Sequence, residues 1–210
     1  MAEMHPLTRA VIDGDKATAV ELTQQCLDEG EAASFIVEQR LVPGMAVIGE
    51  QFQRDEIFVP EMLIAANAMK ASLTLLEPLI AESGVKAPHT AVIGTVEGDL
   101  HDIGKNLVGM MWRGANFEVI DLGVNVSPSS FADAAREHQP DIVGMSALLT
   151  TTVPHMRKAV EAVKATGVDT KILVGGAPVS AEFAEEVGAD GFAEDAGAAA
   201  EVAKSIVSAA

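Results

Sequence analysis

The chain has 210 residues, of which 49% are hydrophobic and 21% charged, so it can bury one large core or two small ones and is too apolar for a disordered chain. Its formal net charge of −17 repels phosphate backbones and anionic lipid surfaces, which argues against nucleic-acid and membrane binding and allows an acidic face for basic partner proteins. The single cysteine, Cys26, the missing leader pattern and apolar runs much shorter than a membrane span together predict a cytoplasmic protein.

The first part of the chain, residues 6–82, predicts a small all-helical bundle. The run 13–15 (Asp-Gly-Asp) ends one short helix and offers Asp15 as the N-cap of the next, which Gly30 stops. A third helix follows, and Pro43-Gly44 predicts its interruption before a fourth. Pro60 marks the start of a longer helix in which apolar residues recur at spacings of three and four.

The remaining residues predict an α/β domain. The polar, Gly- and Pro-containing stretch 82–88 indicates a linker, so we expect a helical-bundle cap domain over 1–87 and an α/β domain over 88–210. Five β-rich runs alternate with five helical runs after Thr90, which is typical of a doubly wound five-stranded parallel sheet of Rossmann or flavodoxin type. The expected strands are 91–96, 118–122, 142–146, 172–174 and 191–193, and the expected helices are 103–113, 129–138, 153–166, 181–187 and 196–207.

In such a sheet, ligands bind beyond the carboxyl ends of the strands, so the loops that follow the strands are the candidate site. Asp99 and His101 are two residues apart in the first of these loops and can point to the same side. An imidazole is a good ligand for a transition metal, and a carboxylate is the usual acceptor for its second nitrogen. Gly104 then leaves room for a bulky group near the start of the next helix. A histidine that only caps a helix or bridges two loops is the alternative.

The other loops at this edge are lined by small residues. Ser146 ends the third strand and is followed by Thr150, Thr151 and Thr152, which leave room for a polar ligand or act as helix caps. Gly175-Gly176 ends the fourth strand, either as a tight turn or to let a ligand approach the backbone. The loops together predict a slot beside one histidine.

These residues resemble the signature of cobalamin-binding domains, D-x-H-x-x-G followed by S-x-L and G-G. The matching elements are Asp99 to Gly104, Ser146 to Leu148 and Gly175-Gly176. The runs 41–52 and 56–70 are similar to the cap bundle of corrinoid proteins in methyltransferase systems, and the same two modules occur in cobalamin-dependent methionine synthase. The resemblance covers nearly the whole chain.

The resemblance implies a cobalamin or a related corrinoid bound base-off and His-on, with His101 as the lower ligand of the cobalt. Asp99 is implied to hydrogen-bond His101, and Thr152 to complete the relay in a position where methionine synthases carry serine. The cofactor-binding residues are then expected to be Asp99, His101, Asp102, Gly104, Leu122, Gly123, Ser146, Leu148, Thr150, Thr152, Gly175 and Gly176. Phe58, Val59 and Met62 are expected to cap the upper face of the corrin ring, although an apolar helical stripe is more often ordinary bundle core.

The function implied by the resemblance is a methyl-carrying subunit in one-carbon metabolism. It would cycle between cobalt(I) and methyl-cobalt(III), loaded by a substrate-specific methyltransferase and unloaded by an acceptor methyltransferase onto tetrahydrofolate or a thiol. A reductive activator protein is a further expected partner. No residue is predicted to be catalytic in the chain itself, so its status as an enzyme on its own stays open.

Three alternatives belong to other classes. The cobalamin-binding small subunit of an adenosylcobalamin mutase normally lacks a cap bundle of this type. A cobalamin-sensing regulator would need a DNA-binding module and a basic face, which a chain of net charge −17 lacks. A flavodoxin-like domain that binds no cobalt would be colourless or flavin-yellow when purified.

Overall fold

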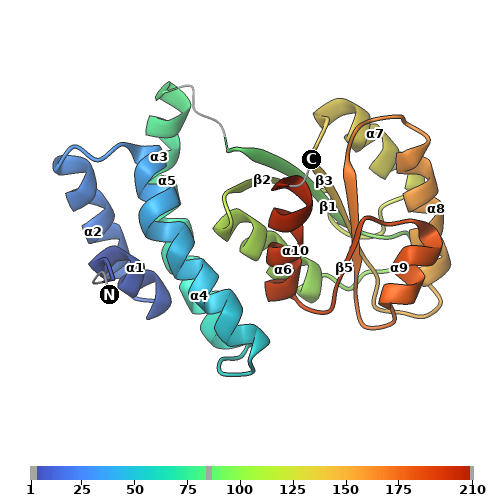
Figure 1. The fold of residues 1–210 in the computed structure, drawn as a ribbon, viewed down its shortest axis with the longest axis horizontal. Coiled ribbons are helices and arrows are strands. Elements are labelled where there is room, and N and C mark those ends of the chain that lie inside the picture. The colour runs from blue at the N-terminus through green and yellow to red at the C-terminus, as the bar shows by residue number, and fades with distance from the viewer. Residues whose placement is uncertain (1–3, 84–86, 209–210) are drawn as a thin grey trace. The chain divides into compact units, whose positions relative to one another are not determined.

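The structure is a computed structural model that describes residues 4–83 and 87–208. The chain divides into two compact units, residues 1–88 counted with 114–116, and residues 89–113 with 117–210. The first unit is helical and the second is a sheet with helices on both faces (Figure 1). Each unit is described by itself below.

The helical unit consists of α1 (Pro6–Ile12), α2 (Lys16–Asp28), α3 (Ala33–Ile36), the π-helical turn η1 (Val37–Leu41), α4 (Val42–Gln53) and α5 (Val59–Ser83). The expected N-cap of α2 is confirmed, because the Asp15 carboxylate accepts a hydrogen bond from the Thr18 amide at 3.0 Å. Helix α5 packs along α2 and also contacts α4 and α1. Its buried side chains include Met62, Met69 and Leu76.

The expected interruption at Pro43-Gly44 is wrong. The backbone stays helical from Ala33 to Gln53, through one π-helical turn and into α4. Pro43 lies in the first turn of α4, where the amide hydrogen that proline lacks is not needed for an intrahelical bond. A β-carbon on Gly44 would come within 3.0 Å of Val11, so the glycine allows α1 to approach α4 closely.

By length and composition alone, α5 could cross a membrane, which the short apolar runs considered in the sequence did not indicate. The segment Val59–Ile80 has 22 residues and a mean hydropathy of 1.3. A core helix of a bundle passes the same test, and α5 contacts several other helices of its unit. The segment is therefore weak support for a membrane span.

The second unit is a parallel five-stranded sheet, as the sequence predicts, and its strand order is β2-β1-β3-β4-β5. The strands are β1 (His89–Thr95), β2 (Phe117–Asp121), β3 (Ile142–Ser146), β4 (Lys171–Gly175) and β5 (Gly191–Ala193). The helices are α6 (Ile103–Gly114), α7 (Pro128–His138), α8 (Val153–Lys164), α9 (Ala181–Val187) and α10 (Ala196–Ser208). The connection from β1 leads to β2 on one side, and the connection from β2 leads to β3 on the other side of β1, so the sheet has its topological switch point between β1 and β3.

Helices α7, α8 and α9 cover one face of the sheet, and α6 and α10 cover the other (Figure 1). On the first face, Phe131 and Met156 are fully buried against strand residues such as Val92. On the second, the Trp112 indole donates a hydrogen bond to the Ala199 carbonyl at 3.0 Å and so joins α6 to α10. These two layers fix the positions of β1 and β3, whose loops form the candidate site.

Candidate functional site

The site lies where β1 and β3 end, at the switch point of the sheet. Strands β1 and β3 pair from Ala91 with Ile142 to Thr95 with Ser146, so their carboxyl ends are level. The loop after β1 therefore lies beside the loop after β3. Asp99 and His101 lie in the first loop and Gly104 at the start of α6, while Leu148 and the threonines lie in the loop that follows Ser146.

Asp99 is the centre of the hydrogen-bonding network that joins these two loops. Its side chain is fully buried. Oδ1 accepts the His101 amide at 3.0 Å and contacts His101 Nδ1 at 2.7 Å. Oδ2 accepts the Leu148 amide at 2.7 Å, the Leu149 amide at 3.3 Å and the Thr152 hydroxyl at 2.9 Å. The two expected side-chain hydrogen bonds of Asp99, to His101 and to Thr152, are thus present.

The same contacts keep the Asp99 carboxyl ionised. Burial is the largest single influence on its pKa and acts to raise it. The donors from Leu148, His101 and Thr152 together outweigh burial and hold the pKa of Asp99 well below its usual range. The site therefore contains a buried carboxylate whose charge is satisfied by protein donors on both oxygens.

His101 is held by one ring nitrogen and open at the other. With Asp99 ionised, the proton of a neutral imidazole is on Nδ1, and Nε2 carries a lone pair. The His101 side chain is 50% exposed, so a ligand can reach it from outside. The backbone is fixed as well, because the buried Thr95 hydroxyl donates to the His101 carbonyl at 2.9 Å. Metal-binding histidines usually have this arrangement, in which a carboxylate accepts a hydrogen bond from the ring nitrogen that does not bind the metal.

Thr152 has two acceptors for one proton. Its hydroxyl lies 2.9 Å from Asp99 Oδ2 and 2.8 Å from the Leu149 carbonyl oxygen. A hydroxyl donates only one hydrogen bond at a time, so these two contacts compete. The Thr152 side chain is buried, at the residue that precedes α8.

The loop after β2 is connected to the same network. Asn125, which the sequence analysis did not single out, donates its amide to the Asp99 carbonyl at 3.0 Å and accepts the Gly98 amide on its side chain at 2.8 Å. Leu122 donates its amide to Ile93, and Gly123 has a left-handed backbone with φ +82°. Asn125 could have been predicted as a site residue, because it is a polar residue in a loop that follows a strand. Thr95, which bonds the His101 carbonyl, could not, because it lies inside a strand.

Lys105, in the first turn of α6, is buried. Its Nζ contacts Asp121 at 2.5 Å and Asn106 at 2.8 Å. Asp121 accepts the Gly123 amide at 2.8 Å on its other oxygen. A buried lysine needs such a partner, and the pair fixes the end of β2 to the first turn of α6.

The candidate glycines differ in what surrounds them. A β-carbon on Gly104 or Gly123 would meet nothing within 4 Å. One on Gly175 would lie 2.9 Å from the Ala193 carbonyl oxygen, and one on Gly176 would lie 1.9 Å from that of Ala147. Gly176 is therefore required by the packing of the backbone, whether or not a ligand approaches it, while Gly104 faces open space.

Large apolar side chains are exposed around His101. Leu100 and Ile103 are 72% and 74% exposed, and Leu148 and Leu149 are 45% and 41% exposed. Of these, only Leu148 was among the expected site residues. The rest of the expected set lies at the same edge: Asp102 and Thr150 are exposed in the two loops, and Ser146 accepts the Val96 amide on its carbonyl.

The three expected cap residues of the helical unit have different surroundings. Phe58 is 64% exposed and Val59 partly buried, whereas Met62 is 1% exposed. The Phe58 amide donates to the Glu61 carboxylate at 3.1 Å, which holds the start of α5. Met62 thus fits the alternative of ordinary core, and Phe58 has a side chain free to contact a ligand.

Replacing Gly104 by valine tests whether the open space beside it is needed for a ligand. We expect the fold to be retained, because the added side chain meets no protein atom and valine replaces a helical glycine at a gain of a few tenths of a kcal/mol, roughly. Retention of cobalamin after desalting should fall sharply. Ala17→Val, which adds bulk at an exposed position in the first turn of α2 in the helical unit, is the control for the added bulk. Full retention in Gly104→Val would remove Gly104 from the site.

Comparisons with known proteins match both units of the chain. The family described as B12 binding domain matches residues 89–203, and a second family of the same description matches residues 4–77. A corrinoid protein of Desulfitobacterium hafniense (strain Y51) is 42% identical over 212 residues, with 99% of this chain and 98% of that protein covered. Dimethylamine corrinoid protein 1 of Methanosarcina acetivorans is 39% identical, with 90% and 88% covered. A chain of the methanol:cobalamin methyltransferase complex MtaBC from Methanosarcina barkeri matches with a TM-score of 0.86 and 27% identity, over 99% of this chain and 80% of that one.

Proposed function

The chain belongs to the corrinoid proteins with B12-binding domains, and on this premise we propose that it carries methyl groups between two methyltransferases on a corrinoid bound through His101. The observation that carries the proposal is the imidazole of His101, fixed through Nδ1 by a buried carboxylate and open at Nε2. The alternative of a mutase subunit is less well supported, because the helical unit also matches a B12-binding family. The alternative of a regulator is less well supported, because a net charge of −17 disfavours a DNA-binding face.

The residues present fit a corrinoid. Among residues 4–83 and 87–208, no group of three or more His, Cys, Asp or Glu side chains is placed to hold a metal. A lone imidazole suits a metal that arrives with its other positions filled by a macrocycle. The exposed Leu100, Ile103 and Leu148 offer an apolar surface to such a ring. Gly104 leaves space beside it.

In this proposal His101 would hold the cobalt of the corrinoid through Nε2. When bound, the corrinoid supplies a cobalt that accepts a methyl group and gives it up. Asp99 contacts Nδ1 of His101 and so would keep Nε2 directed outward, toward the cobalt. Thr152 donates to Asp99 and so tunes how strongly the carboxylate accepts from His101.

The small residues at the ends of the strands are proposed to admit the nucleotide tail of the corrinoid. Gly104, Ser146 and Gly175 lie at the edge where β1, β3 and β4 end. The Leu122-Gly123 loop, held by Asp121 and Thr95, is the expected neighbour on the β2 side. Asp102 and Thr150 are exposed polar side chains that can contact the corrinoid from these loops.

The chain is proposed to act with partners and not as an enzyme on its own. A substrate-specific methyltransferase would load it, an acceptor methyltransferase would unload it to tetrahydrofolate or a thiol, and a reductive activator would restore oxidised cofactor. Two relatives support the methyltransferase partners, one by its name as a dimethylamine corrinoid protein and one as a chain of a methanol:cobalamin methyltransferase complex. We expect this work to be done in the cytoplasm.

A methyl-transfer assay tests the proposal directly. The protein is loaded with hydroxocobalamin, reduced, and treated with ¹⁴C-methyl iodide. We expect label to stay with the protein after desalting and to move to tetrahydrofolate or a thiol only when an acceptor methyltransferase is added. Label that stays on the protein with every acceptor methyltransferase of this class would contradict the proposed carrier role, while cofactor retention would stand.

Phe58 is proposed to protect the upper face of the reduced cofactor. Because Phe58 is 64% exposed, Phe58→Ala should leave the free energy of unfolding within about 0.5 kcal/mol of wild type. The rate at which the reduced holo-protein is oxidised in air, followed by its absorption spectrum, should rise several-fold. Phe35→Ala, which removes another exposed aromatic side chain of the helical unit, serves as the control. Equal oxidation rates in all three proteins would remove Phe58 from the cap.

A further inference from the structure

A second carboxylate–imidazole pair lies beside the Asp99 network. His155 Nδ1 contacts Glu97 Oε2 at 3.0 Å. Glu97 precedes Asp99 by two residues in the loop after β1, and His155 follows Thr152 by three residues in the first turn of α8. Loop and helix are therefore joined twice, by Asp99 with Thr152 and by Glu97 with His155.

The first of these two connections needs support, because Thr152 has a local competitor for its proton. The Leu149 carbonyl oxygen, three residues earlier, is as close to the Thr152 hydroxyl as Asp99 is. Side-chain to backbone bonds of this local kind form readily without any tertiary structure. The contact with Asp99, which spans 53 residues of sequence, depends on α8 staying close to the loop.

The Glu97–His155 pair holds α8 near the loop without using Asp99. Three further hydrogen bonds join the loop after β3 to a side chain of the β1 loop. They come from Leu148, Leu149 and Thr152, and all three end on one oxygen of Asp99, Oδ2. His155 is also tied to Thr152 through the backbone, since its amide donates to the Thr152 carbonyl at 3.0 Å. A shift of His155 would thus move Thr152 with it.

We propose that Glu97 and His155 are positioning residues that keep the Thr152 hydroxyl on Asp99 and so strengthen the binding of His101 to cobalt. The inference rests on the proposed function, because it concerns the ligation of the same corrinoid. An imidazole that is already oriented loses less conformational freedom when it binds the metal. Loosening α8 frees Thr152 to bond Leu149 instead, and the orientation of Asp99 and His101 becomes less fixed.

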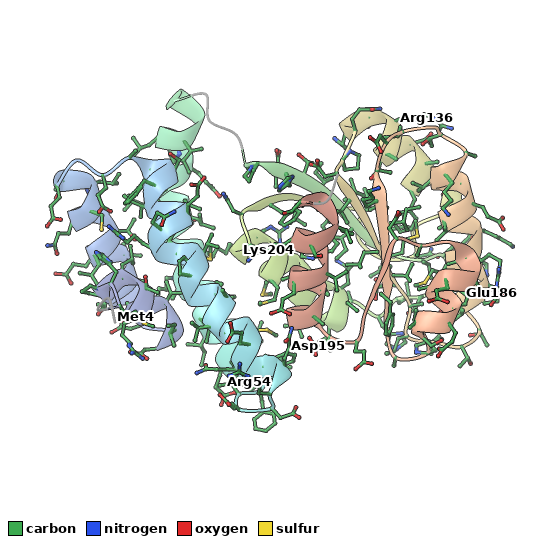
Figure 2. The ribbon with its side chains drawn as sticks, viewed as in Figure 1. Met4, Arg54, Arg136, Glu186, Asp195 and Lys204 are labelled. Carbon is green, nitrogen blue, oxygen red and sulfur yellow. The ribbon has the colours of Figure 1, made fainter. Side chains whose placement is uncertain are left out.

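The test compares five variants with the wild-type holo-protein. Glu97→Ala, His155→Ala and the double variant remove the pair, and Glu97→Gln keeps an oxygen that can accept from His155 Nδ1. Glu186→Ala is the matched control. It removes the ion pair between Arg157 of α8 and Glu186 of α9, 2.7 Å apart, which joins α8 to α9 and not to the β1 loop. Figure 2 labels Glu186 on α9. Each protein is loaded with cob(II)alamin, and its fold is checked by circular dichroism.

The readout is the paramagnetic resonance spectrum at the pH where half of the wild-type cofactor shows axial nitrogen splitting. The ratio of His-on to His-off cofactor should fall roughly two- to fivefold in each alanine variant, the range expected for one partly exposed pair. The double variant should match the single ones, since all break the same contact. Glu97→Gln should lie near wild type, and Glu186→Ala should equal it.

Unchanged ratios in both alanine variants would overturn the inference, and so would an equal loss in Glu186→Ala. Additive losses in the double variant would also overturn it, because two independent effects would then be at work. In each of these cases the wild-type protein still shows axial nitrogen splitting, so the proposed function stands. Wild-type protein that shows no splitting at any pH would instead contradict the proposed ligation by His101.

Discussion

His101→Ala should abolish axial nitrogen splitting in the resonance spectrum of the cob(II)alamin-loaded protein. It should also weaken cofactor retention by more than the roughly 10- to 100-fold that follows the loss of an outer-shell partner of a metal ligand. The fold should survive, because the side chain is half exposed and Asp99 keeps its other donors, from the His101, Leu148 and Leu149 amides and the Thr152 hydroxyl. The loss would then be one of ligation and not of folding.

Two controls make the result for His101 specific. His138→Ala removes an imidazole at the end of α7, in the last turn of that helix, and should leave both the splitting and the retention unchanged. Circular dichroism of the variant proteins should match wild type. Nitrogen splitting that persists in His101→Ala would mean that another side chain, or the cofactor's own base, is the axial ligand.

Asp99→Asn should have the largest effect on stability among the site residues. The carboxylate accepts five hydrogen bonds from donors on both of its oxygens. An asparagine amide offers one oxygen and turns an NH₂ group toward donors on the other side. Leaving such buried donors unpaired should cost about 2–5 kcal/mol in the free energy of unfolding of the apo-protein. Cofactor retention should fall by about 10- to 100-fold as well.

Urea unfolding of the apo-proteins measures this cost, with Asp133→Asn as the control. Asp133 forms an exposed pair with Arg136, so its replacement should change the free energy of unfolding by less than about 1 kcal/mol. Because the pKa of Asp99 is lowered in the folded protein, its stabilising contribution is present above pH 4 and is lost as the pH falls further. The difference between wild type and Asp99→Asn should therefore shrink below about pH 4. A difference under 1 kcal/mol at neutral pH would contradict the role given to Asp99.

Much of the α/β unit could be predicted because its signals are local. Strands β3 and β5 have the predicted bounds, and the others differ at their ends by one or two residues. Alternating β-rich and helical runs leave few possible topologies, and parallel strands place all their following loops at one edge. That is why residues as distant as Asp99 and Thr152 could be assigned to one site before any coordinates.

What could not be predicted depends on contacts between segments. The pairing of Glu97 with His155 spans 58 residues, and nothing near His155 in the sequence distinguishes it from a surface histidine. Lys105 is buried only because Asp121 lies at the end of the neighbouring strand. Pro43 reads as a break in a helix, yet a π-helical turn before it lets a new helix begin at the same place.

The glycines of the signature show one thing that the sequence predicts and one that it cannot. Gly104 and Gly176 belong to the same signature, but the first faces open space and the second lies against the Ala147 carbonyl. A sequence cannot separate a glycine that leaves room for a ligand from one that leaves room for the protein's own backbone. The separation matters for experiments, because Gly104→Val tests ligand binding whereas a substitution at Gly176 would test folding.

The measurement that tests the central claim most directly is the ultraviolet–visible spectrum of apo-protein after reconstitution with hydroxocobalamin and desalting. We predict that wild-type protein retains a corrinoid spectrum and that the spectrum is lost or shifted in His101→Ala. A colourless wild-type protein whose circular dichroism shows an intact fold would contradict the claim that this chain holds a corrinoid through His101.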